Sequence, residues 1–168
     1  VWLEGVPENY IQNLQVTADE RRVRLAVTSP RDCGISVTVR LHDGGLYTVR
    51  TEKKELEIDL DKIRLADGSD YRPVLWTPEH PYLYEITIAM GEDVVFSYFG
   101  LRSIGIREIE GIPRVCLNGE PIFLHGVLDQ GYFCDGIYLP AREEEYGQDV
   151  LRMKELGINL LRKHIKIE

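Results

Sequence analysis

Two apolar runs near the end of this chain are each followed by side chains that could bind a hydroxylated ligand. Five residues are the candidates: Asp129, Gln130, Tyr132, Arg162 and His164. Because an unpaired charge is costly to bury, Asp129 and Arg162 are expected either to pair with each other or to hold substrate hydroxyls. A structural ion pair or a solvated loop explains the same residues equally well from the sequence alone.

The cysteines and histidines show no spacing typical of a metal site. The 3 cysteines are widely spaced and odd in number, which fits neither a disulfide framework nor a zinc site with paired ligands. They are Cys33, Cys116 and Cys134. The 4 histidines, His42, His80, His125 and His164, are equally scattered. We expect buried or partly buried free thiols, and neither a metal nor a cofactor.

The charge balance argues against two classes of partner. The formal net charge is −8 and the pI is about 5.1, values that do not favour an electrostatic grip on nucleic acid or anionic lipid. No apolar run approaches the length that crosses a bilayer. The content of 43% hydrophobic and 29% charged residues is typical of globular proteins. We therefore expect neither a nucleic-acid partner nor a membrane partner.

Short strands separated by turns are expected between residues 11 and 99. Apolar residues alternate with polar ones in a series of segments, which is the period-2 pattern of a half-buried strand. The segments lie near residues 14–16, 23–27, 35–41, 46–49, 56–60, 84–88 and 94–98. Between two of them, Asp43-Gly44-Gly45 supplies residues that tolerate positive φ in a tight turn. The pattern predicts an immunoglobulin-like antiparallel β-sandwich over residues 8–105, without a bridging disulfide.

The segment that precedes residue 84 combines aromatic residues with prolines. Pro78 and Pro81 lack an amide donor, so they block strand pairing until Leu83. Trp76 and Tyr84 are then expected to pack at the end of the sandwich. An exposed aromatic ring that stacks on a sugar is the alternative interpretation.

The sequence pattern changes after residue 105. Asn118-Gly119 between apolar runs predicts a hairpin, because both residues tolerate positive φ. Residues 123–128 are almost continuously apolar, which predicts a strand buried on both faces. A loop rich in aromatic residues and glycine follows at 131–140.

A helix and a second strand are expected after this loop. Apolar residues share one helical face over residues 143–156, and Gly157 is placed as the C-terminal cap. Residues 158–165 predict the next strand. The order strand, helix, strand is typical of a parallel sheet. A closed (β/α)₈ barrel takes about 250 residues, so residues 106–168 predict only the first strands and helix of an incomplete barrel.

Four short motifs follow one another in order along the chain. They are residues 75–84 (LWTPEHPYLY), 99–102 (FGLR), 117–121 (LNGEP) and 124–127 (LHGV). Their order resembles the seam between two domains of glycoside hydrolase family 2, which includes β-galactosidases, β-glucuronidases and β-mannosidases. In that family an immunoglobulin-like sandwich is followed by a catalytic barrel. The resemblance implies that this chain is a fragment of such a glycosidase, with residues 1–7 as the end of a preceding domain.

The resemblance also bears on the candidate site. Family members commonly carry Gly-Val-Asn-Arg-His after the first barrel strand, and this chain keeps only the first two residues in Gly126-Val127-Leu128-Asp129-Gln130. They also carry Asn-x-x-Arg, a histidine and Tyr-Pro at the second strand. Asn159 and Arg162 match this pattern, whereas His164 comes one residue early. The resemblance therefore implies carbohydrate binding in a divergent subfamily with altered specificity.

Hydrolysis of a glycoside with retention needs two carboxyl groups about 5–5.5 Å apart, whose pKa values are held apart. The resemblance places these groups on the fourth and seventh barrel strands, which lie beyond this chain. Glu143-Glu144-Glu145 is a poor substitute, because a helix N-terminus stabilises negative charge and exposes it to water. No catalytic residue is therefore expected here, and the chain is expected to be inactive alone.

Three functions remain open from the sequence. The first is a fragment of a retaining glycoside hydrolase that acts on a carbohydrate. The second is a non-catalytic immunoglobulin-like module that binds carbohydrate or protein, and the third is an adhesion-type sandwich without a link to sugar. Both ends of the chain are strand-like, which predicts cuts inside a larger protein. Unpartnered apolar faces of the barrel strands predict self-association of the fragment.

Overall fold

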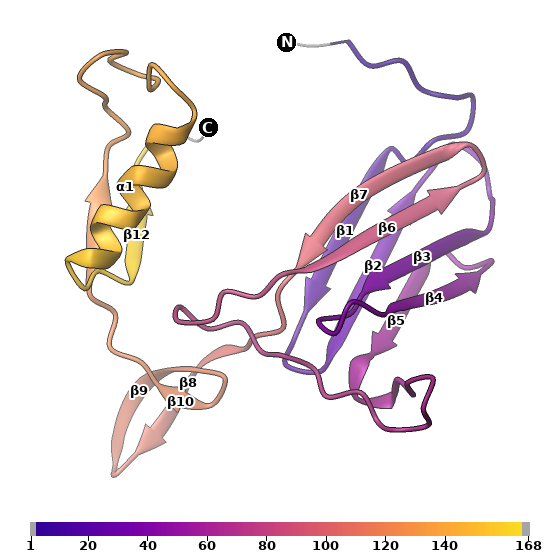
Figure 1. Cartoon of the computed structure of the whole chain (residues 1–168), viewed down its shortest axis with the longest axis horizontal. Helices are drawn as coiled ribbons and strands as arrows, with labels where there is room; N and C mark the ends of the chain where they lie inside the picture. The colour runs from indigo at the N-terminus through magenta and orange to yellow at the C-terminus, as the bar shows by residue number, and fades with distance from the viewer. Residues whose placement is uncertain (1–2, 166–168) are drawn as a thin grey trace. The chain divides into compact units, whose positions relative to one another are not determined.

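Alternating apolar residues form seven antiparallel strands in a computed structural model that describes residues 3–165 (Figure 1). The strands are β1 (Asn13–Ala18), β2 (Arg22–Thr28), β3 (Ile35–Arg40), β4 (Leu46–Thr51), β5 (Glu55–Asp59), β6 (Tyr84–Met90) and β7 (Asp93–Phe99). Each predicted segment corresponds to one of these strands. Successive side chains of a strand point to opposite faces, so the alternation gives each strand one face for the core.

The seven strands form two antiparallel sheets. One sheet has the order β1-β2-β5 and the other has the order β4-β3-β6-β7. In the larger sheet, Val37 of β3 is in register with Val49 of β4 and with Ile88 of β6. The predicted antiparallel β architecture is therefore confirmed for this part of the chain.

Residues from both sheets fill one hydrophobic core. Its buried members are Val23, Leu25, Val27, Ile35, Val37, Val39, Leu41, Ile58, Leu60, Ile63, Tyr71, Tyr84, Ile86, Ile88, Met90, Phe99 and Leu101. Full burial of one aliphatic side chain stabilises a fold by about 1.5–3 kcal/mol. The core is therefore what keeps the two sheets face to face.

The tight turn between β3 and β4 lies at the predicted residues. Gly44 has φ 87°, a value that favours glycine, and its N–H donates to the Leu41 carbonyl at 3.0 Å. The Asp43 carboxylate accepts the Gly45 N–H at 2.9 Å. The prediction of a turn at Asp43-Gly44-Gly45 is confirmed.

The segment between β5 and β6 begins with a short 3-10 helix, η1 (Leu60–Lys62), and is anchored to the core by Tyr84. The Tyr84 ring is fully buried and stacks on Phe99 with 5.0 Å between ring centres. Its hydroxyl accepts the Val74 N–H at 2.7 Å and lies 3.3 Å from the Tyr71 hydroxyl. Burial, and then the hydrogen bond with Tyr71, raise the pKa of Tyr84 far above its ordinary value. The predicted packing of Tyr84 is confirmed.

A three-stranded antiparallel sheet follows β7. Its strands are β8 (Ile104–Ile109), β9 (Ile112–Leu117) and β10 (Glu120–Pro121), in the order β10-β9-β8. Asn118 and Gly119 join β9 to β10 with φ values of 51° and 84°, which confirms the predicted hairpin. Strand β8 was not predicted, and it crosses position 105. The first compact unit of the chain extends to Glu120.

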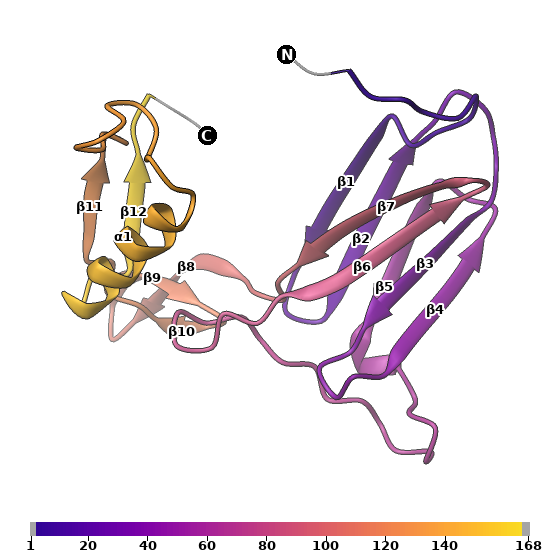
Figure 2. The same ribbon diagram turned by 45° about the horizontal axis from the view of Figure 1, so that its top comes forward.

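The second unit begins at Pro121 and contains two parallel strands joined by a helix. The elements are β11 (Gly126–Asp129), α1 (Glu144–Glu155) and β12 (Leu160–Lys163). In both views α1 runs alongside the two strands (Figure 2). The predicted order of strand, helix and parallel strand is confirmed. No helix among the described residues is long enough and apolar enough to cross a bilayer.

Gly157 ends α1 in the predicted way. It has φ 77°, and its N–H donates to the Lys154 carbonyl at 2.9 Å. The next N–H, of Ile158, donates to the Met153 carbonyl at 3.0 Å. This pair of bonds is the Schellman motif, which turns the chain sharply out of the helix and into β12.

Two expectations for the second unit are wrong. Strand β11 begins at Gly126 rather than at 123, and its side chains are not buried, because Val127 is 37% exposed and Leu128 is 52% exposed. The physical reason is that within residues 3–165 no third strand joins this sheet and α1 is the one element that runs alongside it. Trp2, in the expected preceding domain, and Lys166, which ends the strand-like run at the C-terminus, lie outside the described residues.

Candidate functional site

Strands β11 and β12 are parallel, so their carboxyl ends lie at the same edge of the sheet. Asp129 is in register with Lys163 at this edge, and the His164 N–H donates to the Asp129 carbonyl at 2.9 Å. Four of the five predicted site residues therefore belong to two neighbouring strand ends. In parallel α/β sheets this edge is where ligand sites are built.

Register divides the charged residues between the two faces of the sheet. Arg162 is opposite Leu128, whereas Lys163 is opposite Asp129, one residue further along. Because alternate side chains point to opposite faces, Arg162 and Asp129 lie on different faces and do not pair. Of the two alternatives for these residues, the one in which Asp129 pairs with Arg162 is wrong.

Asp129 pairs instead with Lys163, which is not among the predicted site residues. Its Oδ2 lies 3.1 Å from Lys163 Nζ, and its Oδ1 accepts the Gly131 N–H at 2.8 Å. Gly131 has φ 68°, so the carboxylate supports the turn that follows β11. Asp129 is thus held by a structural ion pair. The strand register identifies Lys163 as the partner of Asp129, and this register cannot be read directly from the sequence.

Gln130 and His164 form a second pair across the strand ends. The Nδ1 atom of His164 lies 3.2 Å from the Oε1 atom of Gln130. Gln130 and His164 each lie one residue beyond the last paired positions of β11 and β12, whereas Arg162 lies within β12 opposite Leu128. Two of the predicted residues are therefore brought into contact, and Arg162 lies on the face of the sheet opposite to the Asp129–Lys163 pair.

Tyr132 lies in the loop that follows β11. Its ring is exposed and is 5.7 Å from the ring of Tyr138 in the same loop. Phe133 and Ile137 exchange backbone hydrogen bonds of 3.0 and 2.9 Å, which fold the loop on itself. Phe133 also meets Tyr146 of α1 edge to face, with 5.3 Å between ring centres. The loop thus presents Tyr132 as an exposed aromatic side chain.

Asn159 fastens the other end of β11. Its side-chain oxygen accepts the His125 N–H at 2.9 Å, and its side-chain nitrogen donates to the Phe123 carbonyl at 2.8 Å. Its own N–H donates to the His125 carbonyl at 3.0 Å. The matching Asn159 of the Asn-x-x-Arg pattern therefore acts as a structural residue that holds the start of β11 beside the start of β12.

Exposed apolar side chains are spread over the whole second unit. They include Phe123, Leu124, Val127, Leu128, Ile137, Leu139, Val150, Leu151, Leu156, Leu160, Leu161 and Ile165. The α1 helix has no buried residue, although Tyr146 and Met153 are half-buried. An apolar surface of this extent is typical of elements that are covered by further structure.

No group of three or more potential metal-ligating side chains occurs among residues 3–165. The cysteines are free: Cys116 is buried, Cys33 is half-buried and Cys134 is exposed. The expectation of buried or partly buried thiols is wrong for Cys134, because it lies in the loop after β11, which no layer of the described residues covers.

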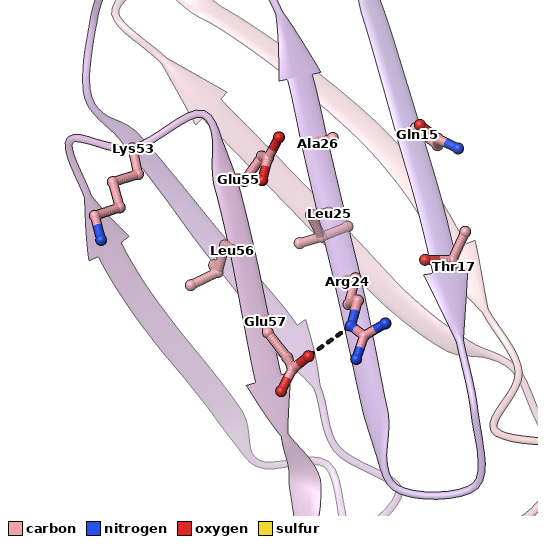
Figure 3. A pocket seen from close by; sticks show the side chains of 9 residues that line it. All are labelled: Gln15, Thr17, Arg24, Leu25, Ala26, Lys53, Glu55, Leu56 and Glu57. Carbon is pink, nitrogen blue, oxygen red and sulfur yellow. Dashed lines mark hydrogen bonds and ion pairs between the residues drawn. The ribbon is translucent and has the colours of Figure 1, made fainter.

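A shallow groove of about 490 Å³ runs over the outer face of the β1-β2-β5 sheet (Figure 3). The outward side chains include Gln15, Thr17 and the pair Arg24–Glu57, in which Arg24 Nε lies 2.5 Å from Glu57 Oε2. None of the nine described residues that line the groove is aromatic. The groove is therefore a sheet surface of mixed polarity, on which Arg24 and Glu57 neutralise each other.

Comparison with protein families gives one match that spans more than half of the chain. Residues 9–102 match the family described as glycosyl hydrolases family 2. A β-galactosidase of Thermoanaerobacter pseudethanolicus is 25% identical over 181 aligned residues, which cover 96% of this chain and 23% of that protein. A putative β-glucuronidase of Formosa agariphila is also 25% identical, over 96% of this chain and 20% of its own length.

Solved structures share the fold of nearly the whole chain. A β-glucuronidase of Faecalibacterium prausnitzii superposes with a TM-score of 0.72 at 24% identity, over 94% of this chain and 24% of that chain. A β-glucuronidase of Ruminococcus gnavus superposes with a TM-score of 0.70 at 18% identity, over 95% of this chain and 25% of that chain. This chain spans between a fifth and a quarter of each relative. On the family match, the chain belongs to glycosyl hydrolases family 2.

Proposed function

We propose that this chain is part of a retaining glycoside hydrolase. In this proposal residues 1–7 end a preceding domain, residues 8–105 are an immunoglobulin-like sandwich that serves as scaffold, and residues 106–168 open the (β/α)₈ barrel. The observation that carries the proposal is the parallel β11–α1–β12 unit, which has exposed apolar faces and polar side chains at its carboxyl edge. Further strands of a barrel would cover those faces.

The two faces of the β11–β12 sheet would have different roles in the barrel. Val127 and Leu161, which share a face with the Asp129–Lys163 pair, are less exposed than Leu128 and Leu160 on the other face. We assign the more shielded face to the helix layer. The more exposed face, which carries Leu128 and Arg162, would then point into the barrel, with Gln130 and His164 at its carboxyl end, where ligands bind.

The substrate in this proposal is a β-glycoside, since the relatives are named β-galactosidase and β-glucuronidase. Gln130, Arg162 and His164 would bind sugar hydroxyls, and the exposed Tyr132 ring would flank the sugar. Asp129 would act indirectly, through the turn at Gly131. The two catalytic carboxyl groups would come from later barrel strands, so the isolated chain would be inactive.

The first-turn glutamates of α1 do not change this assignment. Glu145 lies 3.4 Å from Arg142, a pair on the helix surface, and Glu143 and Glu144 are exposed. An exposed carboxylate at a helix N-terminus is a solvated charge that the helix dipole favours. These three glutamates therefore form no enclosed pair of carboxyl groups around a substrate.

The proposal is tested by comparing the 168-residue chain with the complete protein encoded by its gene. Both are assayed with p-nitrophenyl β-galactoside and β-glucuronide, and the anomer released first is identified by proton NMR. We expect the longer protein to hydrolyse at least one glycoside with retention, and the isolated chain to hydrolyse none. A longer protein that is inactive on both, or one that inverts the anomeric centre, would contradict the proposal.

One observation favours a second candidate, a carbohydrate-binding module. Phe96 and Tyr98 lie on the same face of β7, and Phe96 is 78% exposed. Two aromatic rings at alternate strand positions could stack on successive sugar units. Calorimetric titration of the chain with oligosaccharides tests this function. Binding that is lost in Phe96→Ala would support it, and the absence of heat with every sugar would exclude it.

A further inference from the structure

Strand β7 forms a free edge of the larger sheet of the sandwich (Figure 2). It pairs with β6 on one side, and no strand within residues 3–165 pairs with its other side. A groove of about 350 Å³ lies beside the end of β7, and Val16, Tyr98 and Ile104 are among its lining residues. The backbone N–H and C=O groups on the open side are therefore available to a further strand.

The outward side chains of β7 differ from those of the other edge strands of the sandwich. Val94, Phe96 and Tyr98 are 46%, 78% and 65% exposed, and we call these three residues the β7 stripe. Proteins usually discourage unwanted pairing by placing charged residues on their edge strands. The residues at the equivalent alternate positions of the other three edges are Asn13, Gln15 and Thr17 in β1, Leu46, Thr48 and Arg50 in β4, and Glu55, Glu57 and Asp59 in β5. Of these four edges, β7 is the one with an aliphatic or aromatic side chain at every such position.

The neighbouring strand adds little charge beside the β7 stripe. The stripe is in register with Ala89, Thr87 and Glu85 of β6. The Oε2 atom of Glu85 lies 2.9 Å from Nε of Arg40, so the charge of this carboxylate is compensated on the same sheet. A strand that docks on β7 would therefore meet an apolar row whose border is small or charge-compensated.

The spacing of the β7 stripe is self-complementary. If two copies of β7 pair antiparallel about a two-fold axis at Phe96, each Phe96 lies opposite the other, and Val94 of each copy lies opposite Tyr98 of the other copy. Aromatic pairs and pairs of an aromatic with a β-branched residue are favourable across antiparallel strands. The same arrangement keeps the two Glu92 residues about 26 Å apart along the strands, which avoids repulsion between the two turns. Such an interface, in which one surface matches itself, is what a two-fold dimer requires.

We propose that β7 is a dimer interface, on which β7 of a second copy of this protein adds antiparallel with the two-fold axis at Phe96. The two four-stranded sheets then join into one continuous sheet. This inference goes beyond the proposed glycosidase function and does not depend on it, because it uses the sandwich alone.

The test is disulfide cross-linking of the complete protein encoded by the gene, in variants that each gain one cysteine. Opposite residues of an antiparallel pair have Cα atoms about 4.5–5.5 Å apart, which suits a disulfide. With oxidised glutathione, we expect Phe96→Cys to form a covalent dimer. Val94→Cys is the matched control, because its two cysteines would lie about 13 Å apart along the strands. The yield of covalent dimer should be about 10-fold higher for Phe96→Cys than for Val94→Cys.

A mixture of two variants tests the register. Neither Val94→Cys nor Tyr98→Cys should cross-link by itself, whereas an equimolar mixture should give a covalent dimer that contains one copy of each. Native cysteines are the same in every variant, so they do not affect the comparison. A Phe96→Cys protein with no more covalent dimer than Val94→Cys overturns the inference, whether another domain covers the stripe or a sugar binds there. Cross-linking of Val94→Cys alone to the level of Phe96→Cys also overturns it, because the copies would then not pair about Phe96.

Discussion

The guanidinium carbon of Arg102 lies 4.6 Å from the centre of the Trp76 ring. This cation–π contact joins two of the motifs whose order resembles a family 2 seam. Asn118, from a third motif, donates its side-chain N–H to the Trp76 carbonyl at 3.0 Å and accepts the Ser103 N–H at 3.0 Å. Three motifs that are far apart in the sequence therefore meet in one cluster of the first unit.

Asn118 combines this bridging role with a left-handed backbone, because its φ is 51°. We expect Asn118→Gly to lower the free energy of unfolding by about 1–2 kcal/mol, since it loses two hydrogen bonds but keeps the turn. Asn118→Ala should lose about 1 kcal/mol more, because alanine is strained at positive φ. Urea denaturation of the chain measures both. Equal stability of the wild type and Asn118→Gly would show that the bridge contributes nothing.

Tyr84 should make the first unit sensitive to high pH. Burial first, and the hydrogen bond with Tyr71 next, raise the pKa of Tyr84 above its ordinary value of 10.0. The folded chain therefore keeps this proton at a pH where the unfolded chain releases it. The contribution of this proton to the free energy of unfolding is fully present below pH 10. Above pH 10 the free energy of unfolding should fall by about 1.4 kcal/mol per pH unit.

The matched control for this effect is Tyr84→Phe, which keeps the ring and removes the proton. Its unfolding free energy should be lower than that of the wild type at pH 7, by about 1–3 kcal/mol, because the Val74 N–H loses its acceptor. Between pH 10 and 11 it should fall less steeply than that of the wild type. Parallel pH profiles of the two proteins, measured by urea denaturation, would contradict this account.

The start of β11 should depend on Asn159. We expect Asn159→Leu to raise the hydrogen-exchange rate of the His125 amide, because it removes the acceptor 2.9 Å away. Asn159→Asp is the matched control. It keeps that acceptor and loses only the donor to Phe123, so the His125 amide should stay protected. Equal exchange in all three proteins would show that the side chain does not hold this strand.

A substitution in the sandwich core should be far more harmful than one on the outer face of the same sheet. Ile88 is fully buried in β6, so Ile88→Ala should lower the free energy of unfolding by about 2–5 kcal/mol. Phe96 is in the neighbouring strand β7 with its ring exposed, and Phe96→Thr should change stability by less than about 0.5 kcal/mol. Similar losses in the two variants would contradict the assignment of the core.

The isolated chain should self-associate through its second unit. Leu128 and Leu160 are both exposed. Leu128 lies near the carboxyl ends of the two strands, and Leu160 lies at their amino ends. We expect sedimentation velocity to show species larger than the monomer at micromolar concentration, and fewer of them in the double variant Leu128→Lys, Leu160→Lys. A compact monomer of the unmodified chain would count against an incomplete barrel.

The sandwich and the hairpin could be predicted from the sequence because local patterns specify them. The alternation Ile35, Val37, Val39 needs one buried face, and the structure buries all three residues. A tight turn requires positive φ, which Asn118 and Gly119 tolerate and adopt in the structure. The C-terminal cap at Gly157 is a local signal of the same kind. The positions of these elements along the chain can therefore be recognised without knowing which distant residues they contact.

The details of the candidate site could not be predicted, because they depend on strand register. A shift of one residue moves every side chain to the other face, and no local signal distinguishes Arg162 from Lys163 as the residue opposite Asp129. Strand β8 was missed for a different reason. Ile104 and Ile106 occupy alternate positions, as in a half-buried strand. Both side chains remain exposed, so neither belongs to the hydrophobic core.

The β11–β12 pair has two unlike free edges, one on each strand, because the strands are parallel and no third strand joins them within residues 3–165. If β12 of one copy pairs with β11 of the next, the far edge of each copy remains open. Such contacts join unlike surfaces and do not close on themselves as a two-fold dimer does. Copies of the isolated chain would therefore add in sequence, and the average particle mass should keep rising with concentration instead of levelling off at twice the monomer.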